Sequence, residues 1–92
     1  MVTLEELKAH LRIETDAEDG CLQGLLRAAE AAAADFCGQP LSEAPEPARL
    51  AVLLFAGYHY THRESDDTAA YAAMKAAFQA LLWPYRSPEA LF

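Results

Sequence analysis

Residues 22–37 read LQGLLRAAEAAAADFC, and this stretch decides the fold class. Its apolar positions recur with the 3.6-residue period of an α-helix, which places them on one face. These positions are Leu22, Leu25, Leu26, Ala29, Ala33 and Phe36. Alanine loses no side-chain entropy in a helix, so the run between them favours the same structure. Gly38, which precedes Gln39 and Pro40, predicts the helix end because glycine adopts the left-handed terminal conformation without strain.

The remainder of the chain follows the same pattern, because 20 of its 92 residues are alanine and Val, Ile and Thr together number seven. Thr3 and Glu6 fit a capping box, Asp16 is expected to cap the second helix, and Pro47 suits the first position of the third. Pro84 stops the fourth helix. We expect one all-α domain, a small bundle of about four helices. They cover residues 3–13, 16–37, 47–64 and 69–83, with a short C-terminal tail over 84–92.

The net charge of the chain argues against two classes of function. Seven basic and fourteen acidic residues leave a net charge of −7. A general nucleic-acid binder, or a protein that binds anionic membrane surfaces, would carry a positive charge instead. No stretch approaches the ~20 apolar residues of a membrane-spanning helix. The N-terminus is acidic, unlike a signal peptide, so we expect a protein that is made and kept in a cytoplasm.

Several groups of residues resemble chemical sites only in part. His59 and His62 have an i, i+3 spacing that suits two metal ligands, but no third ligand or HExxH pattern accompanies them. Cys21 or Cys37 with a histidine would make a nucleophile–base pair, but apolar helical neighbours disfavour a thiolate. On one helix these cysteines lie too far apart for a disulfide, so we expect reduced, buried thiols.

A calcium loop is the other alternative that the sequence raises. Its candidate ligands are Glu14, Asp16, Glu18 and Asp19. The cluster lacks the glycine and the closing glutamate of an EF-hand loop, so interaction with the start of a helix explains it better. We expect no enzyme, no metal and no cofactor.

Two features favour assembly with other subunits. Residues 50–58 are apolar on every face of the expected third helix, and so small a domain has too few neighbours to enclose them. The segment Trp83-Pro84-Tyr85-Arg86 combines two large aromatics with an arginine, the residue types enriched at protein–protein contacts. The alternative that Trp83 and Tyr85 complete the monomer core has equal weight.

Three segments resemble the small head–tail connector (adaptor) proteins of tailed bacteriophages, prophages and gene transfer agents. They are residues 7–29 (LKAHLRIETDAEDGCLQGLLRAA), 50–64 (LAVLLFAGYHYTHRE) and 81–86 (LLWPYR). The first is fairly specific, whereas either of the others alone would be weak. Together they cover most of the chain in the order that the family shows.

The resemblance implies a structural virion protein of the head–tail neck, made in the bacterial host cytoplasm. It implies a homo-oligomeric, dodecameric ring beneath the portal protein, which extends the DNA channel and carries the stopper or tail-completion protein. DNA would pass through without sequence-specific binding, and no membrane is involved. A net negative charge suits such a channel, because phosphates are repelled rather than held.

The resemblance and the composition together suggest three sets of site residues. A portal-docking tail contains Trp83, Tyr85, Arg86, Leu91 and Phe92. A subunit interface contains Arg12, Leu54, Phe55, Tyr58, Tyr60 and Arg63. Acidic residues facing the channel are Glu5, Glu6, Glu14 and Asp19. The alternative function is a small helical regulatory or interaction module of the antitoxin type, but no helix here is basic, as a DNA-recognition helix would be.

Overall fold

The computed structural model describes residues 2–41, 45–62 and 67–87, and these residues contain helices and connections but no strand. The helices are α1 (Leu4–Leu11), α2 (Asp19–Cys37), α3 (Glu46–Thr61) and α4 (Thr68–Leu82), followed by a 3₁₀ turn, η1 (Trp83–Tyr85). The predicted all-α bundle with a short C-terminal tail is therefore confirmed.

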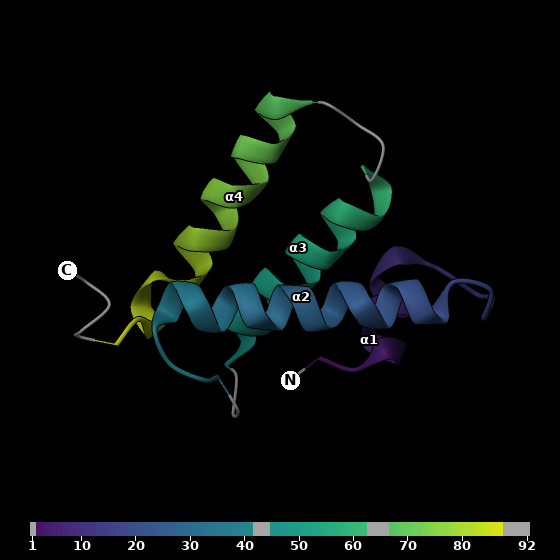
Figure 1. Cartoon of the computed structure of the whole chain (residues 1–92), viewed down its shortest axis with the longest axis horizontal. Coiled ribbons are helices and arrows are strands. Elements are labelled where there is room, and N and C mark those ends of the chain that lie inside the picture. The colour runs from purple at the N-terminus through teal and green to yellow at the C-terminus, as the bar shows by residue number, and fades with distance from the viewer. Residues whose placement is uncertain (1, 42–44, 63–66, 88–92) are drawn as a thin grey trace.

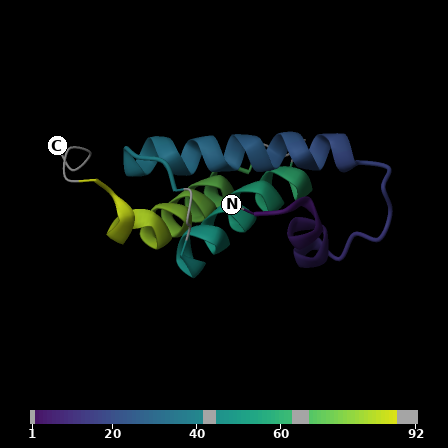
Figure 2. The same ribbon diagram turned by 90° about the horizontal axis from the view of Figure 1, so that it is seen from below.

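The helices form two layers. In Figure 1, α2 crosses in front of α3 and α4, which lie beside each other and run in opposite directions. Figure 2 shows α2 as one layer, with α3 and α4 beneath it and α1 near the N-terminal end of α2. The central helix is α3, because it packs more extensively than any other helix against the rest of the bundle, with its largest contacts to α2 and α4.

All four helices contribute to the core. Its largest fully buried side chains are Leu7, Leu22, Leu26, Val52, Cys37 and Leu82. Small residues of α3 allow its neighbours to approach closely. At Gly57, a Cβ atom would lie only 3.2 Å from Cδ2 of Leu11, so glycine lets α1 cross α3 at this point.

Two predicted helix boundaries are confirmed in detail. The Thr3 hydroxyl accepts the Glu6 backbone N–H at 3.1 Å, and the Glu6 carboxylate accepts the Thr3 N–H at 3.1 Å, which completes the capping box. Gly38 adopts the left-handed conformation (φ 73°), and its N–H donates to the Ala34 carbonyl at 2.8 Å. Both signals are local in the sequence, so they act whatever the rest of the chain does.

The prediction that Asp16 caps α2 is wrong. This helix begins at Asp19, and the residue before it, Glu18, makes no capping hydrogen bond with its side chain. The carboxylates of Asp16 and Asp19 instead accept from the Lys8 ammonium, at 3.0 and 2.8 Å respectively. These bonds raise the pKa of Lys8 and tie the start of α2 to α1.

The other helix ends differ by a few residues from those predicted. Glu46 rather than Pro47 is the first residue of α3, and Thr61 is its last. The α4 helix begins at Thr68, because the Asp67 carboxylate accepts the Ala70 N–H at 2.9 Å. It ends before Trp83, where the backbone tightens into the 3₁₀ turn that contains Pro84.

Candidate protein-interaction surfaces

The C-terminal segment, residues 83–87, is attached to the end of α2. The Ser87 N–H donates to the Cys37 carbonyl at 2.8 Å, and the Gln39 side-chain amide donates to the Tyr85 carbonyl at 2.7 Å. The Cys37 carbonyl belongs to the last turn of a helix, where no intrahelical N–H can reach it. The segment therefore supplies a hydrogen bond that α2 needs, and its own backbone becomes fixed in return.

Arg86 strengthens this attachment through its charge and its flat guanidinium. The guanidinium carbon lies 4.5 Å from the ring centroid of Phe36 and 5.2 Å from that of Trp83. These are cation–π distances. Because the last turn of α2 carries no basic residue of its own, Arg86 also supplies the positive charge that the helix dipole favours there.

The two aromatics of this segment have different environments. Tyr85 is half-buried and packs against the core, whereas Trp83 has 56% of its surface exposed. Trp83 still contacts the bundle on one side, with its ring centroid 6.3 Å from that of Phe36. Tyr85 thus completes the core of the monomer, whereas Trp83 remains available on the surface. Leu91 and Phe92 lie outside the described residues.

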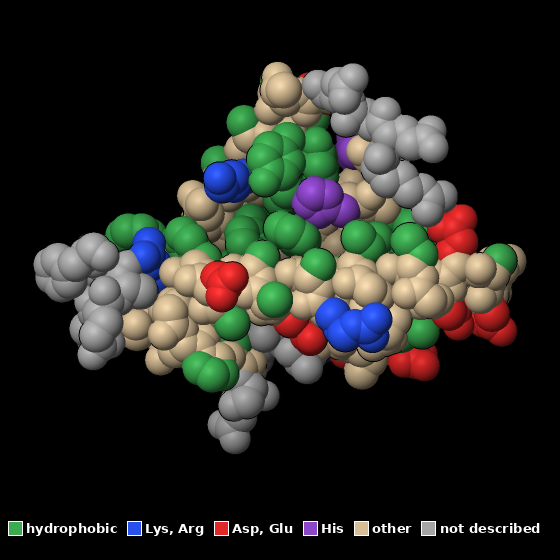
Figure 3. Space-filling view, viewed as in Figure 1, with side chains coloured by type: hydrophobic (Ala, Val, Ile, Leu, Met, Phe, Trp, Pro, Cys, Tyr) green, Lys and Arg blue, Asp and Glu red, His purple; other side chains and the backbone are tan. Residues whose placement is uncertain are grey.

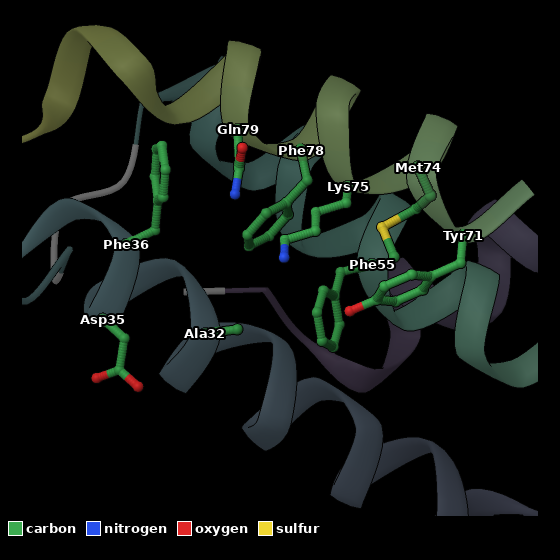
Figure 4. A pocket seen from close by; sticks show the side chains of 9 residues that line it. All are labelled: Ala32, Asp35, Phe36, Phe55, Tyr71, Met74, Lys75, Phe78 and Gln79. Atoms are coloured by element: carbon green, nitrogen blue, oxygen red, sulfur yellow. The ribbon is translucent and has the colours of Figure 1, made fainter. Parts of the chain in front are cut away.

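An apolar groove of about 360 Å³ separates α2 from α4, and we call it the α2–α4 groove. Figure 3 shows hydrophobic side chains gathered between these two helices. Its lining is Ala32, Asp35, Phe36, Phe55, Tyr71, Met74, Lys75, Phe78 and Gln79. Figure 4 shows the aromatic rings and Met74 pointing into the space, with Lys75 reaching from α4 toward α2. Tyr71, Met74 and Phe78 follow a helical period typical of core packing, and this period gives no sign that a groove remains.

A second hollow of about 340 Å³, the α1–α3 groove, lies where α1, α3 and α4 meet. Its lining is Glu6, Glu46, Pro47, Arg49, Leu50, Leu53 and Leu81. Leu50 is 48% exposed, so the subunit by itself does not enclose the apolar stretch of α3. An ion pair between Glu6 and Arg49 crosses the hollow from α1 to α3.

The predicted subunit-interface residues have different environments. Phe55 and Tyr58 belong to an aromatic cluster between α3 and α4, where the Phe55 ring lies 5.2 Å from that of Phe78 and the Tyr58 ring 6.0 Å from that of Tyr71. Leu54 and Tyr60 are half-buried against the core. Arg12 is exposed at the end of α1 and has a left-handed backbone, and Arg63 is outside the described residues.

The histidine pair belongs to the same aromatic cluster. The His62 ring stacks on Tyr58 with 4.3 Å between centroids, and the His59 ring lies 4.5 Å from that of Phe55. Burial lowers the pKa of His59, which favours its neutral form. Across residues 2–41, 45–62 and 67–87, no three His, Cys, Asp or Glu side chains gather as metal ligands would.

The two cysteines differ, and the expectation that both are buried is wrong for Cys21. Cys21 is exposed on α2, whereas Cys37 is buried, with its sulfur 3.7 Å from the Leu82 carbonyl. Burial raises the pKa of the Cys37 thiol, and the nearby charge of Arg86 opposes this effect only in part. The helical period leaves Cys21 one position before the apolar stripe that begins at Leu22, which explains its exposure.

Acidic side chains gather at one end of the molecule, over α1 and the start of α2 (Figure 3). Of the four predicted channel residues, Glu5 and Glu14 are exposed. The carboxylate of Glu6 pairs with Arg49 and that of Asp19 with Lys8, so each is partly neutralised within the subunit. Within the acidic cluster of the α1–α2 connection, Asp16 and Asp19 both form ion pairs with Lys8.

A bundle of this size, with two apolar grooves and an exposed tryptophan on an attached segment, has surface features typical of subunits that assemble with other proteins. Within the described part of the chain, no helix is both long and apolar enough to cross a bilayer. Residues 1–86 match the family described as phage gp6-like head-tail connector protein, and the chain belongs to this family. No curated protein and no solved structure matches the chain.

Membership confirms the resemblance that residues 7–29, 50–64 and 81–86 indicate. Proteins of this family are structural components of phages and not enzymes. The chain is accordingly a component of the virion that assembles with other head and tail proteins.

Proposed function

We propose that this protein, acting as a single domain, forms a homo-oligomeric, dodecameric ring beneath the portal at the head–tail neck. The ring extends the DNA channel and offers a platform to the stopper or tail-completion protein. The observation that carries this proposal is the family match over residues 1–86. The half-exposed Leu50 and the apolar grooves support it, because a closed ring buries different faces of each subunit on its neighbours.

The C-terminal segment is the part of the subunit that we assign to the portal. Hydrogen bonds at Tyr85 and Ser87, together with the stacking of Arg86, hold this segment in one place before any partner binds. A segment that is already ordered loses less conformational entropy when it docks. Trp83, exposed beside it, supplies the type of side chain that most often dominates binding energy.

The acidic end of the molecule is the part that we assign to the channel. Glu5 and Glu14 are exposed there, so they contribute more uncompensated negative charge than the ion-paired Glu6 and Asp19. Repeated around a ring, these charges would repel DNA phosphates and prevent adhesion during passage. Sequence-specific DNA binding is not part of the proposal.

The decisive experiment adds purified portal protein to this chain and measures the mass of the complex by light scattering, with negative-stain images to count the subunits. A ring-sized mass on the portal is expected. Trp83→Ala and a truncation after Ser87 should both weaken portal binding while the helical circular dichroism stays unchanged. Arg27→Ala, an exposed change on α2 outside both grooves, serves as the control. A 10.1 kDa monomer that does not bind the portal would contradict the proposal.

A further inference from the structure

The α2–α4 groove carries one cation at its edge. Lys75 is exposed on α4 and reaches over the groove, whose interior contains Phe55, Met74 and Phe78 (Figure 4). Among the residues that the structure describes, Lys75 forms no ion pair within 4 Å. The groove therefore offers an apolar interior, with the Lys75 ammonium at its α4 edge and the Asp35 carboxylate at its α2 edge.

The first turn of α3 offers the opposite combination. Leu50 is 48% exposed, and Glu46, one turn earlier, has a side chain that is 93% exposed. Residues four apart lie on the same side of a helix, so Glu46 and Leu50 form a ridge with one negative charge and one large apolar group. The Glu46 carboxylate lies 3.6 Å from Nε of Arg49, but an ion pair this exposed is weak and easily exchanged.

These two surfaces are distinct parts of the subunit. The α2–α4 groove and the α1–α3 groove, which contains the ridge, share no lining residue, and α2 contributes only to the first. A head-to-tail ring needs two different surfaces that complement each other in shape and charge. Contacts between copies of a chain with net charge −7 also need cations at the interface to offset their repulsion.

We infer that the Glu46–Leu50 ridge of one copy binds in the α2–α4 groove of the next copy. Leu50 packs between the aromatic rings of the groove, and Glu46 pairs with Lys75 at its edge. This inference rests on the proposed ring and specifies the surfaces through which its subunits meet. It replaces most of the interface residues expected from sequence, since only Phe55 among them lines the groove.

Charge exchange tests the pairing. Lys75→Glu and Glu46→Lys should each weaken self-association at least about tenfold, because each places like charges together. The double variant restores the opposite charges and the net charge of −7, so it should regain most of the wild-type association. Leu50→Asp should abolish association without unfolding the exposed start of α3. The measurement is sedimentation equilibrium at constant salt, up to about 1 mM protein.

Matched controls separate the specific contact from the change in net charge. Arg27→Glu alters the net charge as Lys75→Glu does, from an exposed position on α2 outside both grooves. Glu5→Lys matches Glu46→Lys, because both acidic residues lie in the first turn of a helix. Both controls should associate within about threefold of the wild type. Equal effects of Lys75→Glu and Arg27→Glu, or a double variant no better than the single ones, would overturn the pairing.

Cross-linking tests the same contact on the portal-bound assembly. In a Cys21→Ser background, a variant with Leu50→Cys and Tyr71→Cys, the second of which lies in the groove, should oxidise to a ladder of dimers, trimers and larger species. A variant with Leu50→Cys and Arg27→Cys should form no such ladder. If rings form on the portal but neither the ladder nor the charge exchange appears, the inferred contact is wrong while the proposed function stands. If the chain neither self-associates nor binds the portal, both fail.

Discussion

The guanidinium of Arg86 lies 4.5 Å above the ring of Phe36, and this contact joins the C-terminal segment to the last turn of α2. The arginine places a positive charge at the end of a helix that has no basic residue in its own last turn. The guanidinium carbon also lies 5.2 Å from the centroid of the exposed Trp83 ring. One residue thus links the stability of the bundle to the position of the aromatic that we assign to the portal.

Replacing Arg86 should therefore destabilise the isolated subunit. Arg86→Ala removes both cation–π contacts and the charge at the helix end, which together are worth about 1–2 kcal/mol of unfolding free energy. Arg86→Lys keeps the charge but loses the planar stacking, so its unfolding free energy should lie between those of the wild type and Arg86→Ala. Urea unfolding followed by circular dichroism measures the difference. Arg27→Ala is the exposed control, and an Arg86→Ala midpoint equal to it would disprove the role.

Two of the glycines within helices, Gly24 and Gly57, should respond differently to alanine. At Gly24 in α2 an added Cβ meets nothing within 4 Å, so Gly24→Ala should stabilise the protein by about 0.5–1 kcal/mol. At Gly57 the same atom lies 3.2 Å from Leu11, and α1 or its side chain must shift to accept it. Gly57→Ala should consequently show a smaller gain or a loss. Equal changes in thermal unfolding would indicate that α1 does not pack against Gly57.

The capping box of α1 should contribute measurably although it lies on the surface. Thr3→Ala removes the hydroxyl that accepts the Glu6 N–H, at a cost of about 1 kcal/mol. Thr3→Ser retains that acceptor, so its unfolding free energy should stay within a few tenths of a kcal/mol of the wild-type value. Chemical denaturation of the three proteins provides the comparison, and a serine variant as unstable as the alanine variant would point to the threonine methyl group instead.

The thiols should differ sharply in reactivity. Exposed Cys21 should react with an aromatic disulfide reagent in the native protein, and buried Cys37 only after unfolding. Because the folded pKa of Cys37 is raised, the folded state holds its proton where the unfolded chain has released it, so stability falls as pH rises above the ordinary thiol pKa. Cys37→Ala should flatten this alkaline decline. Two native thiols that react at the same rate would contradict the burial of Cys37.

His59 should produce the opposite dependence at acid pH. Its folded pKa is lowered by burial, so below its ordinary pKa of 6.5 the unfolded chain binds a proton that the folded state does not. Its contribution is complete above pH 6.5 and is lost as pH falls through the folded pKa. Urea midpoints between about pH 8 and about pH 5 should decline less in His59→Gln than in the wild type. The exposed His10→Gln variant is the control and should retain the full decline.

The candidate surfaces were predictable only in part from the sequence. The composition of Trp83–Arg86 predicts an interaction surface, because large aromatics and arginine are enriched where proteins meet. The sequence does not predict the α2–α4 groove. Tyr71, Met74 and Phe78 follow a helical period that predicts core packing, and this period does not show where the packing leaves a groove open. Asp16 was misassigned for a related reason: capping is a local rule, and its competitor, Lys8, lies on another helix.

By itself, the sequence determined the helices, the Thr3 capping box, the left-handed end at Gly38 and the family, because each of these depends on residues close together along the chain or on their order. Only the tertiary structure decided that Cys37 is buried while Cys21 is exposed, that Arg86 covers Phe36, and that Leu50 stands open to solvent. Such outcomes depend on the angles and distances at which helices pack. A periodic pattern indicates which face of a helix is directed toward the core, but the neighbouring helices determine how completely that face is covered.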